Sequence, residues 1–268
     1  MKDIESNITG IFQTPVYTTK LKNCFSKKKI DFIINQEKAS QIGTDSKSKN
    51  LAKKILGPAY SKLYAPSENK FILNKKEFKT LKKELELILQ DYFNKIICSS
   101  DDITPYITQS WLNYSEPGKF HHEHNHPNSY ISGVVYVQCH ETLDKISFVN
   151  HSYKIIRPEV KEHNVFNSLT WTIPVKTNDV ILFPSSLSHF VPPNEGDNTR
   201  ISLSFNTFIK GTVGLMNSAT GLIFKMNIDY NYYFWGPLLF KTILQKQDIV
   251  AIKKLCNKKK SNLYVKGL

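Results

Sequence analysis

The sequence contains very little arginine. Of its 36 lysine and arginine residues, only Arg157 and Arg200 are arginine. The guanidinium of arginine binds phosphates through two parallel hydrogen bonds. Because arginine is so scarce, the net charge of +13 indicates a bias toward lysine in the composition more than a phosphate-binding surface. Much of the excess is local, because residues 240–268 hold eight lysines and one acid. No zinc-finger or RNA-binding aromatic motif accompanies this charge, so nucleic-acid binding stays open without a motif that supports it.

Paired cysteines and long apolar runs are also missing. The four cysteines, Cys24, Cys98, Cys139 and Cys256, form no C-x-x-C pair, which argues against a zinc ribbon or a disulfide framework. We interpret them as free thiols. No segment approaches the roughly 20 apolar residues that span a bilayer, and the first ten residues lack the apolar stretch of a signal peptide. We therefore expect a soluble, cytoplasmic protein without a membrane partner.

Histidine, by contrast, is concentrated in one place. Four of the eight histidines stand within six positions, at His121, His122, His124 and His126. Imidazole is the commonest metal ligand in proteins, and residues i and i+2 of an extended segment face the same side, so His-x-His can place two nitrogens on one ion. A solvated loop or a tag is the alternative, but this cluster is internal and an apolar run follows it. The cluster predicts a metal site.

Residues 103–215 predict an antiparallel sandwich or barrel, because short strand-like segments alternate with turn signals. We expect strands at residues 106–113, 130–138, 145–148, 170–174, 179–183, 189–191 and 200–209. Residues 176–179 form a good hairpin turn between two of them. The fold class that we infer is mainly β with flanking helices (α+β), as a double-sheet jelly roll of the cupin-like type.

The flanking segments are expected to support this core. In residues 1–102 we predict a short helix at 26–35 with Ser26 as its cap. We also predict a long helix at 75–97, with Asn74 as its cap and an apolar stripe that packs on the sheet.

Residues 216–268 predict a C-terminal extension. An aromatic patch at 230–235 precedes an amphipathic, basic helix at 239–256.

A second polar group stands between residues 181 and 206. His189 follows an apolar strand, and a turn then leads into a strictly alternating strand. The polar residues that share one face of this strand are Arg200, Ser202, Ser204 and Asn206. If this face lines the interior beside His189, it suits a dicarboxylate chelated to a metal. An ordinary half-exposed strand is the alternative, which the histidine cluster makes less favoured.

The order of these elements resembles the Fe(II)/2-oxoglutarate-dependent oxygenases. More narrowly, it is similar to a subfamily from marine phage and bacterial genomes, with a likeness over residues 10–215. The motifs that carry it are Trp111-x-Asn113, Gly118, His124-x-His126-Pro127-Asn128 and Ser132-Gly133-x-x-Tyr136-Val137. The resemblance implies a double-stranded β-helix that couples oxidative decarboxylation of 2-oxoglutarate to hydroxylation of an unknown substrate, using O2 and releasing succinate and CO2. A phage-encoded protein of this kind would work in the host cytoplasm.

The resemblance also implies roles for individual residues. His124, His126 and His189 would bind Fe(II). The far carboxylate of 2-oxoglutarate would lie on Arg200, with Ser202 beside it. Two further co-substrate contacts are implied at Asn113 and at Ser132, which corresponds to the threonine of a T-x-L-x-Y-L strand in prolyl-hydroxylase-like enzymes.

The sequence departs from that family at the metal. The usual triad is two histidines and a carboxylate, whereas His124-x-His126 supplies no acid. Three neutral ligands also suit Zn(II). His121 and His122 followed by Glu123 would restore a His-x-Glu pair, and His122 with His124 is a third register. We prefer His124 and His126 because of their spacing from Phe120 and the strand that begins near Ser132.

Two other classes of function remain. The first is a three-histidine, cupin-like metalloenzyme that uses oxygen or water without 2-oxoglutarate, in which Arg200 has no co-substrate role. The second is a non-catalytic binding module whose basic C-terminal segment attracts acidic partners. The sequence leaves the oligomeric state open.

Overall fold

The structure is a computed structural model that describes residues 6–22, 25–36, 50–51, 53–55, 57–151, 158–215 and 220–224. It divides into two compact units, residues 1–209 and residues 210–268. The aromatic patch and the basic helix that we predicted in the C-terminal extension lie outside the described residues. None of the described helices is long and apolar enough to cross a membrane.

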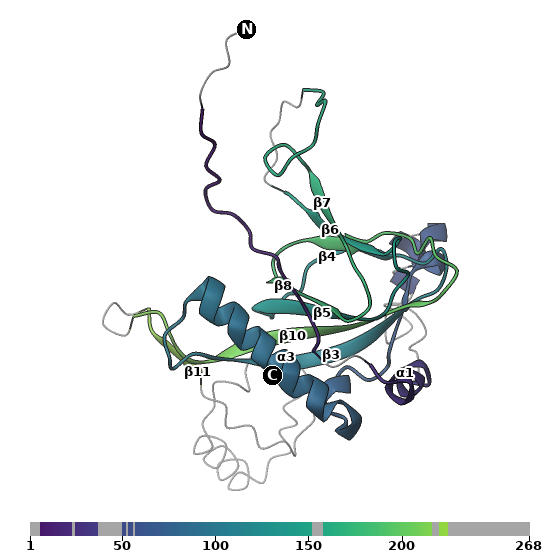
Figure 1. Ribbon diagram of the computed structural model, residues 1–268, viewed down its shortest axis with the longest axis horizontal. Helices are drawn as coiled ribbons and strands as arrows, with labels where there is room; N and C mark the ends of the chain where they lie inside the picture. The colour runs from purple at the N-terminus through teal and green to yellow at the C-terminus, as the bar shows by residue number, and fades with distance from the viewer. Residues whose placement is uncertain are drawn as a thin grey trace, which may run out of the picture. The chain divides into compact units, whose positions relative to one another are not determined.

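Two antiparallel sheets form the body of the first unit (Figure 1). The larger sheet has the strand order β1-β8-β5-β10-β3-β2, and the smaller has the order β4-β9-β6-β7. The strands of the larger sheet are β1 Tyr17–Lys20, β2 Ala65–Pro66, β3 Thr104–Ser115, β5 Ile131–Gln138, β8 Asp179–Pro184 and β10 Arg200–Val213. Those of the smaller sheet are β4 His121–His124, β6 Lys145–Val149, β7 Thr170–Pro174 and β9 His189–Val191.

The chain passes repeatedly from one sheet to the other. From β3 to β10 each successive strand changes sheet, except that β6 and β7 are neighbours in the smaller one. This connection is that of a double-stranded β-helix, a form of jelly roll. The predicted fold class is therefore confirmed, and all seven expected strands are present within a few residues of their predicted ends.

Strand β10 has the alternation that its sequence predicts. Ile201, Leu203 and Phe205 are buried on one face, while Ser202 and Ser204 are half-buried on the other face and line a pocket between the sheets. The ring of Phe205 packs directly on Gly133 of β5, where any Cβ atom would collide with it. The strand thus has a polar face toward the pocket and an apolar, buried face on the other side of the sheet.

Helix α3, Lys79–Tyr92, lies along the outside of the larger sheet and contacts β3 (Figure 1). Its buried stripe confirms the predicted packing face and consists of Leu81, Leu85, Leu89 and Tyr92. The predicted start is wrong, because Lys75 has an extended backbone and separates two short 3₁₀ segments. Asn74 does not cap the helix, and its side chain accepts a hydrogen bond from Lys82 instead.

Shorter helical segments complete the support. Helix α1, Lys27–Ile34, begins at the predicted cap Ser26, whose hydroxyl accepts a hydrogen bond from the Lys29 amide. Further helical segments are η1 Gly57–Lys62, η2 Ile72–Asn74, η3 Lys76–Phe78 and the π-helical η4 Phe93–Ile97. In the second unit, β11 Leu222–Phe224 pairs with the end of β10 at residues 211–213. Of the cysteines in the described residues, Cys98 and Cys139 are free.

The stripe on α3 can be tested by comparing two leucines of the same helix. Leu85 is 0% exposed and Leu87 is 72% exposed. We expect Leu85→Ala to lower the free energy of unfolding by roughly 2–5 kcal/mol, because it leaves a cavity beneath the sheet. Leu87→Ala should change it by less than about 0.5 kcal/mol. Urea unfolding followed by circular dichroism measures both, and equal losses would contradict the packing described.

Candidate metal centre

Strands β4 and β9 bring two of the predicted ligands together. They pair antiparallel, with His124 opposite His189, although the two histidines are far apart in the sequence. His126 follows two residues after His124, just beyond the end of β4. We did not predict β4 as a strand. Its four residues are all polar or charged, so no apolar alternation marks it.

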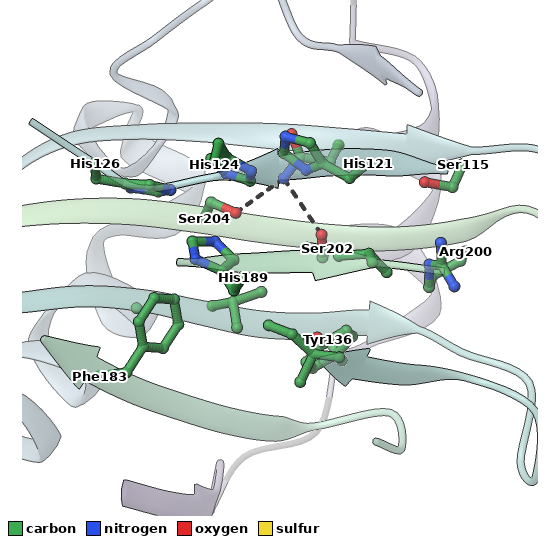
Figure 2. Close-up of a pocket in the computed structure, with 15 residues that line it drawn as sticks. Ser115, His121, His124, His126, Tyr136, Phe183, His189, Arg200, Ser202 and Ser204 are labelled. Atoms are coloured by element: carbon green, nitrogen blue, oxygen red, sulfur yellow. Dashed lines mark hydrogen bonds between the residues drawn. The ribbon is translucent and has the colours of Figure 1, made fainter. Parts of the chain in front are cut away.

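The three side chains converge on one point between the sheets. One nitrogen from each of His124, His126 and His189 lies within 4.8 Å of those of the other two. Figure 2 shows the three rings gathered toward one end of the pocket. The structure therefore brings together the three residues that we expected at a metal, and among the described residues this is the group whose geometry suits an ion.

Hydrogen bonds fix which nitrogen each ring offers. Nδ1 of His124 lies 2.8 Å from the carbonyl oxygen of His122, and Nδ1 of His189 lies 3.1 Å from that of Leu187. Nδ1 of His126 lies 2.6 Å from Oδ1 of Asn206. All three acceptors are oxygens without a proton, so each Nδ1 donates and each Nε2 keeps its lone pair. Such carbonyl partners typically orient metal-bound histidines.

Burial keeps these rings neutral. It is the largest cause that lowers the pKa of His124 to about 4 and that of His189 to about 3. Burial likewise lowers the pKa of His126, where the hydrogen bond to Asn206 acts in the opposite direction. Neutral imidazole is the form that binds metal, so protons compete little for these nitrogens near neutral pH.

The alternative ligands are not part of the three-histidine group. Glu123 points to His151, with Oε1 and Nε2 3.0 Å apart, and does not join the three-histidine group. His122 is absent from the pocket lining. His121 does line the pocket, because a bulge in β4 places it on the same side as His124, with the rings stacked at 4.0 Å. Its ring lies against Tyr64 and outside the converging group.

The opposite end of the pocket contains Arg200. Figure 2 shows Ser204, Ser202 and Arg200 in a row, with Ser204 beside His124 and His189 and Arg200 furthest from them. Asn113 of β3 donates from Nδ2 to both serine hydroxyls, at 3.4 Å to Ser202 and 2.9 Å to Ser204. The predicted polar row thus faces the interior, as we expected. The pocket lining also includes the apolar residues Val134, Ile146, Phe183 and Val191.

Two buried polar atoms in this pocket have no hydrogen-bond partner among the described residues. They are Oδ1 of Asn113 and the hydroxyl of Tyr136. A buried polar atom without a partner costs free energy, so such atoms mark a place where a polar ligand would be stabilised. The hydroxyl of Tyr136 can donate to a carboxylate that lies beside Arg200.

Ser132 lies away from the pocket lining. Its hydroxyl is 2.8 Å from that of Ser185 in a buried group that also includes Ser129. It is not among the residues that line the pocket in the described part of the chain. The co-substrate contact that we predicted for Ser132 stays a prediction.

Sequence reasoning missed three residues of the site. Asn206 was placed on the inward face without a role, and it orients His126. Tyr136 was part of a motif without an assigned contact. Asp144 was not considered, although it forms a buried ion pair with Arg200 at 2.8 Å. The strand alternation of β10 is the signal that could have pointed to Asn206.

The donor set fits a divalent metal of intermediate softness. Three neutral imidazole nitrogens suit Fe(II), Zn(II) or a similar ion, and open positions remain for other ligands. The far end, with a guanidinium, a tyrosine hydroxyl and serine hydroxyls, fits a carboxylate. A molecule that spans both ends would therefore carry a metal-chelating group and a second carboxylate.

The comparison with protein families agrees with this chemistry. Residues 109–206 match a family model described as "Putative 2OG-Fe(II) oxygenase". All the pocket residues fall inside this segment. The match supports the superfamily of 2-oxoglutarate- and iron-dependent oxygenases, whereas the phage and marine-bacterial subfamily stays a prediction. No curated protein matched the sequence.

Solved structures with a similar chain path include three oxygenases. A 2OG-Fe(II) oxygenase family oxidoreductase from Burkholderia pseudomallei is 13% identical over 63% of this chain and 82% of its own, with a TM-score of 0.39. A Pseudomonas putida prolyl-4-hydroxylase is 11% identical over 66% and 96%, with a TM-score of 0.37. A collagen prolyl hydroxylase from Paramecium bursaria Chlorella virus-1, solved with 2OG, is 13% identical over 71% and 94%, with a TM-score of 0.39.

The buried histidines predict how stability of the metal-free protein depends on pH. Burial lowers their pKa from 6.5, to about 4 in His124 and about 3 in His189, so below pH 6.5 the unfolded chain binds more protons than the folded one. The free energy of unfolding should therefore fall as the pH falls from 7 to 5. Each such histidine contributes up to ~1.4 kcal/mol per pH unit.

Replacing one histidine isolates its contribution. His189→Gln should make the pH dependence shallower by up to about one proton, measured by urea unfolding at a series of pH values. His163→Gln, which changes an exposed histidine, is the control and should keep the original slope. If both variants had the same slope, burial would not keep His189 neutral.

Proposed function

We propose that this protein is an Fe(II)- and 2-oxoglutarate-dependent oxygenase that hydroxylates an unspecified second substrate and releases succinate and CO2. The observation that carries the proposal is that one pocket has a group of possible metal ligands at one end and an arginine at the other. Three histidines with oriented Nε2 atoms lie at one end, and Arg200 lies at the other. The family match over the same segment supports it.

In this proposal His124, His126 and His189 hold the metal, and each keeps its orientation through its Nδ1 hydrogen bond. Arg200 and Ser202 hold the far carboxylate of 2-oxoglutarate, and Asn113 orients Ser202 through its amide. When Fe(II), 2-oxoglutarate and O2 are bound, they supply the oxidative chemistry.

The other pocket residues fix the shape of the site and exclude water from it. Phe183 packs its ring edge-on against His189, with centroids 4.7 Å apart, and so restricts the movement of that ring. The hydroxyl of Tyr136 donates to the far carboxylate, which satisfies a buried donor that otherwise has no partner among the described residues. Apolar residues between the ends exclude water from the space beside the metal.

A second candidate function is favoured by a specific contact. Arg200 already pairs with Asp144, and its Nη2 donates to the carbonyl oxygen of Pro192 at 3.1 Å. An arginine with these partners can act as a purely structural residue. The chain would then be a three-histidine metalloenzyme that uses oxygen or water without 2-oxoglutarate.

Anaerobic reconstitution separates these functions. We expect protein loaded with Fe(II) to develop the visible metal-to-ligand absorption band when 2-oxoglutarate is added, and to form succinate after O2 is admitted. His189→Ala should lose both signals because one of three ligands is missing. His163→Ala, at an exposed position, should keep both.

The two outcomes differ clearly. A protein that binds iron tightly but shows neither the band nor succinate would be the three-histidine enzyme of the second candidate. A protein that holds no metal would contradict both candidates.

The role of Arg200 is tested by its removal. We expect Arg200→Leu to weaken 2-oxoglutarate binding by about tenfold to a hundredfold, because the hydrogen bonds of the guanidinium are lost and the buried Asp144 is left without its partner. Metal content should not change, since the histidines lie at the other end of the pocket (Figure 2). Titration of the absorption band measures affinity, and atomic absorption measures metal.

Lys95→Leu is the matched control, because it removes a cation whose ion pair with Asp91 is on the surface. It should leave both measurements unchanged. Loss of metal in Arg200→Leu would mean that the ends of the pocket are not independent and that the assignment of Arg200 is wrong.

A further inference from the structure

Asp144 is the most deeply buried acid near the pocket. Its side chain is 1% exposed and that of Arg200 is 4% exposed. Oδ1 accepts a hydrogen bond from Nη1 of Arg200 at 2.8 Å, and Oδ2 accepts one from the backbone amide of His140 at 2.7 Å. Its backbone carbonyl oxygen also accepts from Val175 at 3.0 Å. Asp144 is thus held on two sides, and its carboxylate is fixed against the guanidinium.

This pair changes the charge that the far end of the pocket presents. A buried ion pair is expensive to desolvate, and its net field on a third group is much weaker than that of a single buried cation. Of the 15 residues that line the pocket in the described part of the chain, none is acidic, and Arg200 is the cation. Asp144 stands just behind this lining and cancels the charge of Arg200.

The formal charges of this arrangement can be compared with those of a site that has a carboxylate on the metal. With a divalent ion on three neutral histidines, the ion contributes +2, Arg200 contributes +1 and Asp144 contributes −1, which gives +2. A site with two histidines and one carboxylate on the metal, and an unpaired arginine, has the same sum. In this chain the negative charge stands at the arginine end instead of on the metal.

We propose that Asp144 is a positioning and specificity-determining residue for the co-substrate. It holds the guanidinium in place and neutralises the far end of the pocket, while the full charge of the ion remains at the histidine end. This inference rests on the proposed function, and it adds a specificity. The far end recognises an oxygen acceptor of the right shape, and a negative charge on that group adds little affinity.

The test compares three 2-oxoacids on full-length protein loaded with Mn(II) and titrated anaerobically by calorimetry. The first is 2-oxoglutarate. The second is 2,5-dioxohexanoate, in which a methyl ketone replaces the far carboxylate. The third is 2-oxobutanoate, which lacks the far group and reports on the metal end alone. The decisive quantity is the ratio of the dissociation constants of 2,5-dioxohexanoate and 2-oxoglutarate.

For the wild-type protein we expect this ratio to be below about tenfold. Asp144→Asn leaves the charge of Arg200 uncompensated, so the ratio should rise by about tenfold or more, through tighter binding of 2-oxoglutarate. The affinity for 2-oxobutanoate and the metal content should stay unchanged. Glu195→Gln is the control, because it removes an exposed acid that pairs with Lys145, and its ratio should match the wild type.

Several results would overturn the inference. One is a wild-type ratio above tenfold, which decides the matter even where Asp144→Asn does not fold. Another is a folded Asp144→Asn protein whose ratio is unchanged or lower, as expected of a residue that only stabilises the fold. If the Mn(II)-loaded wild type binds 2-oxobutanoate and 2-oxoglutarate equally well, the proposed role of Arg200 fails. If it binds none of the three acids, the proposed function itself fails.

Discussion

The antiparallel pairing of β4 with β9 is the constraint on which the site depends. It places His124 directly opposite His189. The chain then continues to His126, whose ring nitrogen lies within 4.8 Å of those of the other two histidines. Strand β4 has no apolar residue of its own, whereas β9 contributes Phe190 and Val191. Both are held because β9 also pairs with β6, and because the larger sheet packs across the interior from them. The three histidines are therefore positioned by the sheets as a whole.

The larger sheet supplies the other half of the site through a simple alternation. On β10, Ser202 and Ser204 face the pocket, and Ile201, Leu203 and Phe205 are buried on the opposite face. The same strand carries Arg200 at one end of the pocket and Asn206, the partner of His126, at the other. The extended geometry of the strand thus fixes the separation between Arg200 and the histidine end of the pocket.

Much of this was visible in the sequence, for identifiable reasons. Alternation revealed β10 and its polar row, and the crowding of histidines revealed the candidate ligands. Strand β4 was missed because His121 to His124 show no apolar pattern, and its pairing comes from β9. The partners Asp144 and Asn206 were missed because their contacts join residues 56 and 80 positions apart. The alternation of apolar and polar residues within a strand predicts which face of the sheet a side chain lies on. It does not predict which distant residue that side chain contacts.

These long separations have a consequence for how the site forms during folding. Closing contacts between distant segments costs chain entropy, which makes such pairings slow to form. Each of the three histidines depends on one such contact: His124 on β9, His189 on β4, and His126 on Asn206. The three side chains therefore come together only after both sheets have closed. The arrival of full metal affinity in a refolding experiment would mark the last step of assembly, later than the formation of α3, whose contacts along its own length are local.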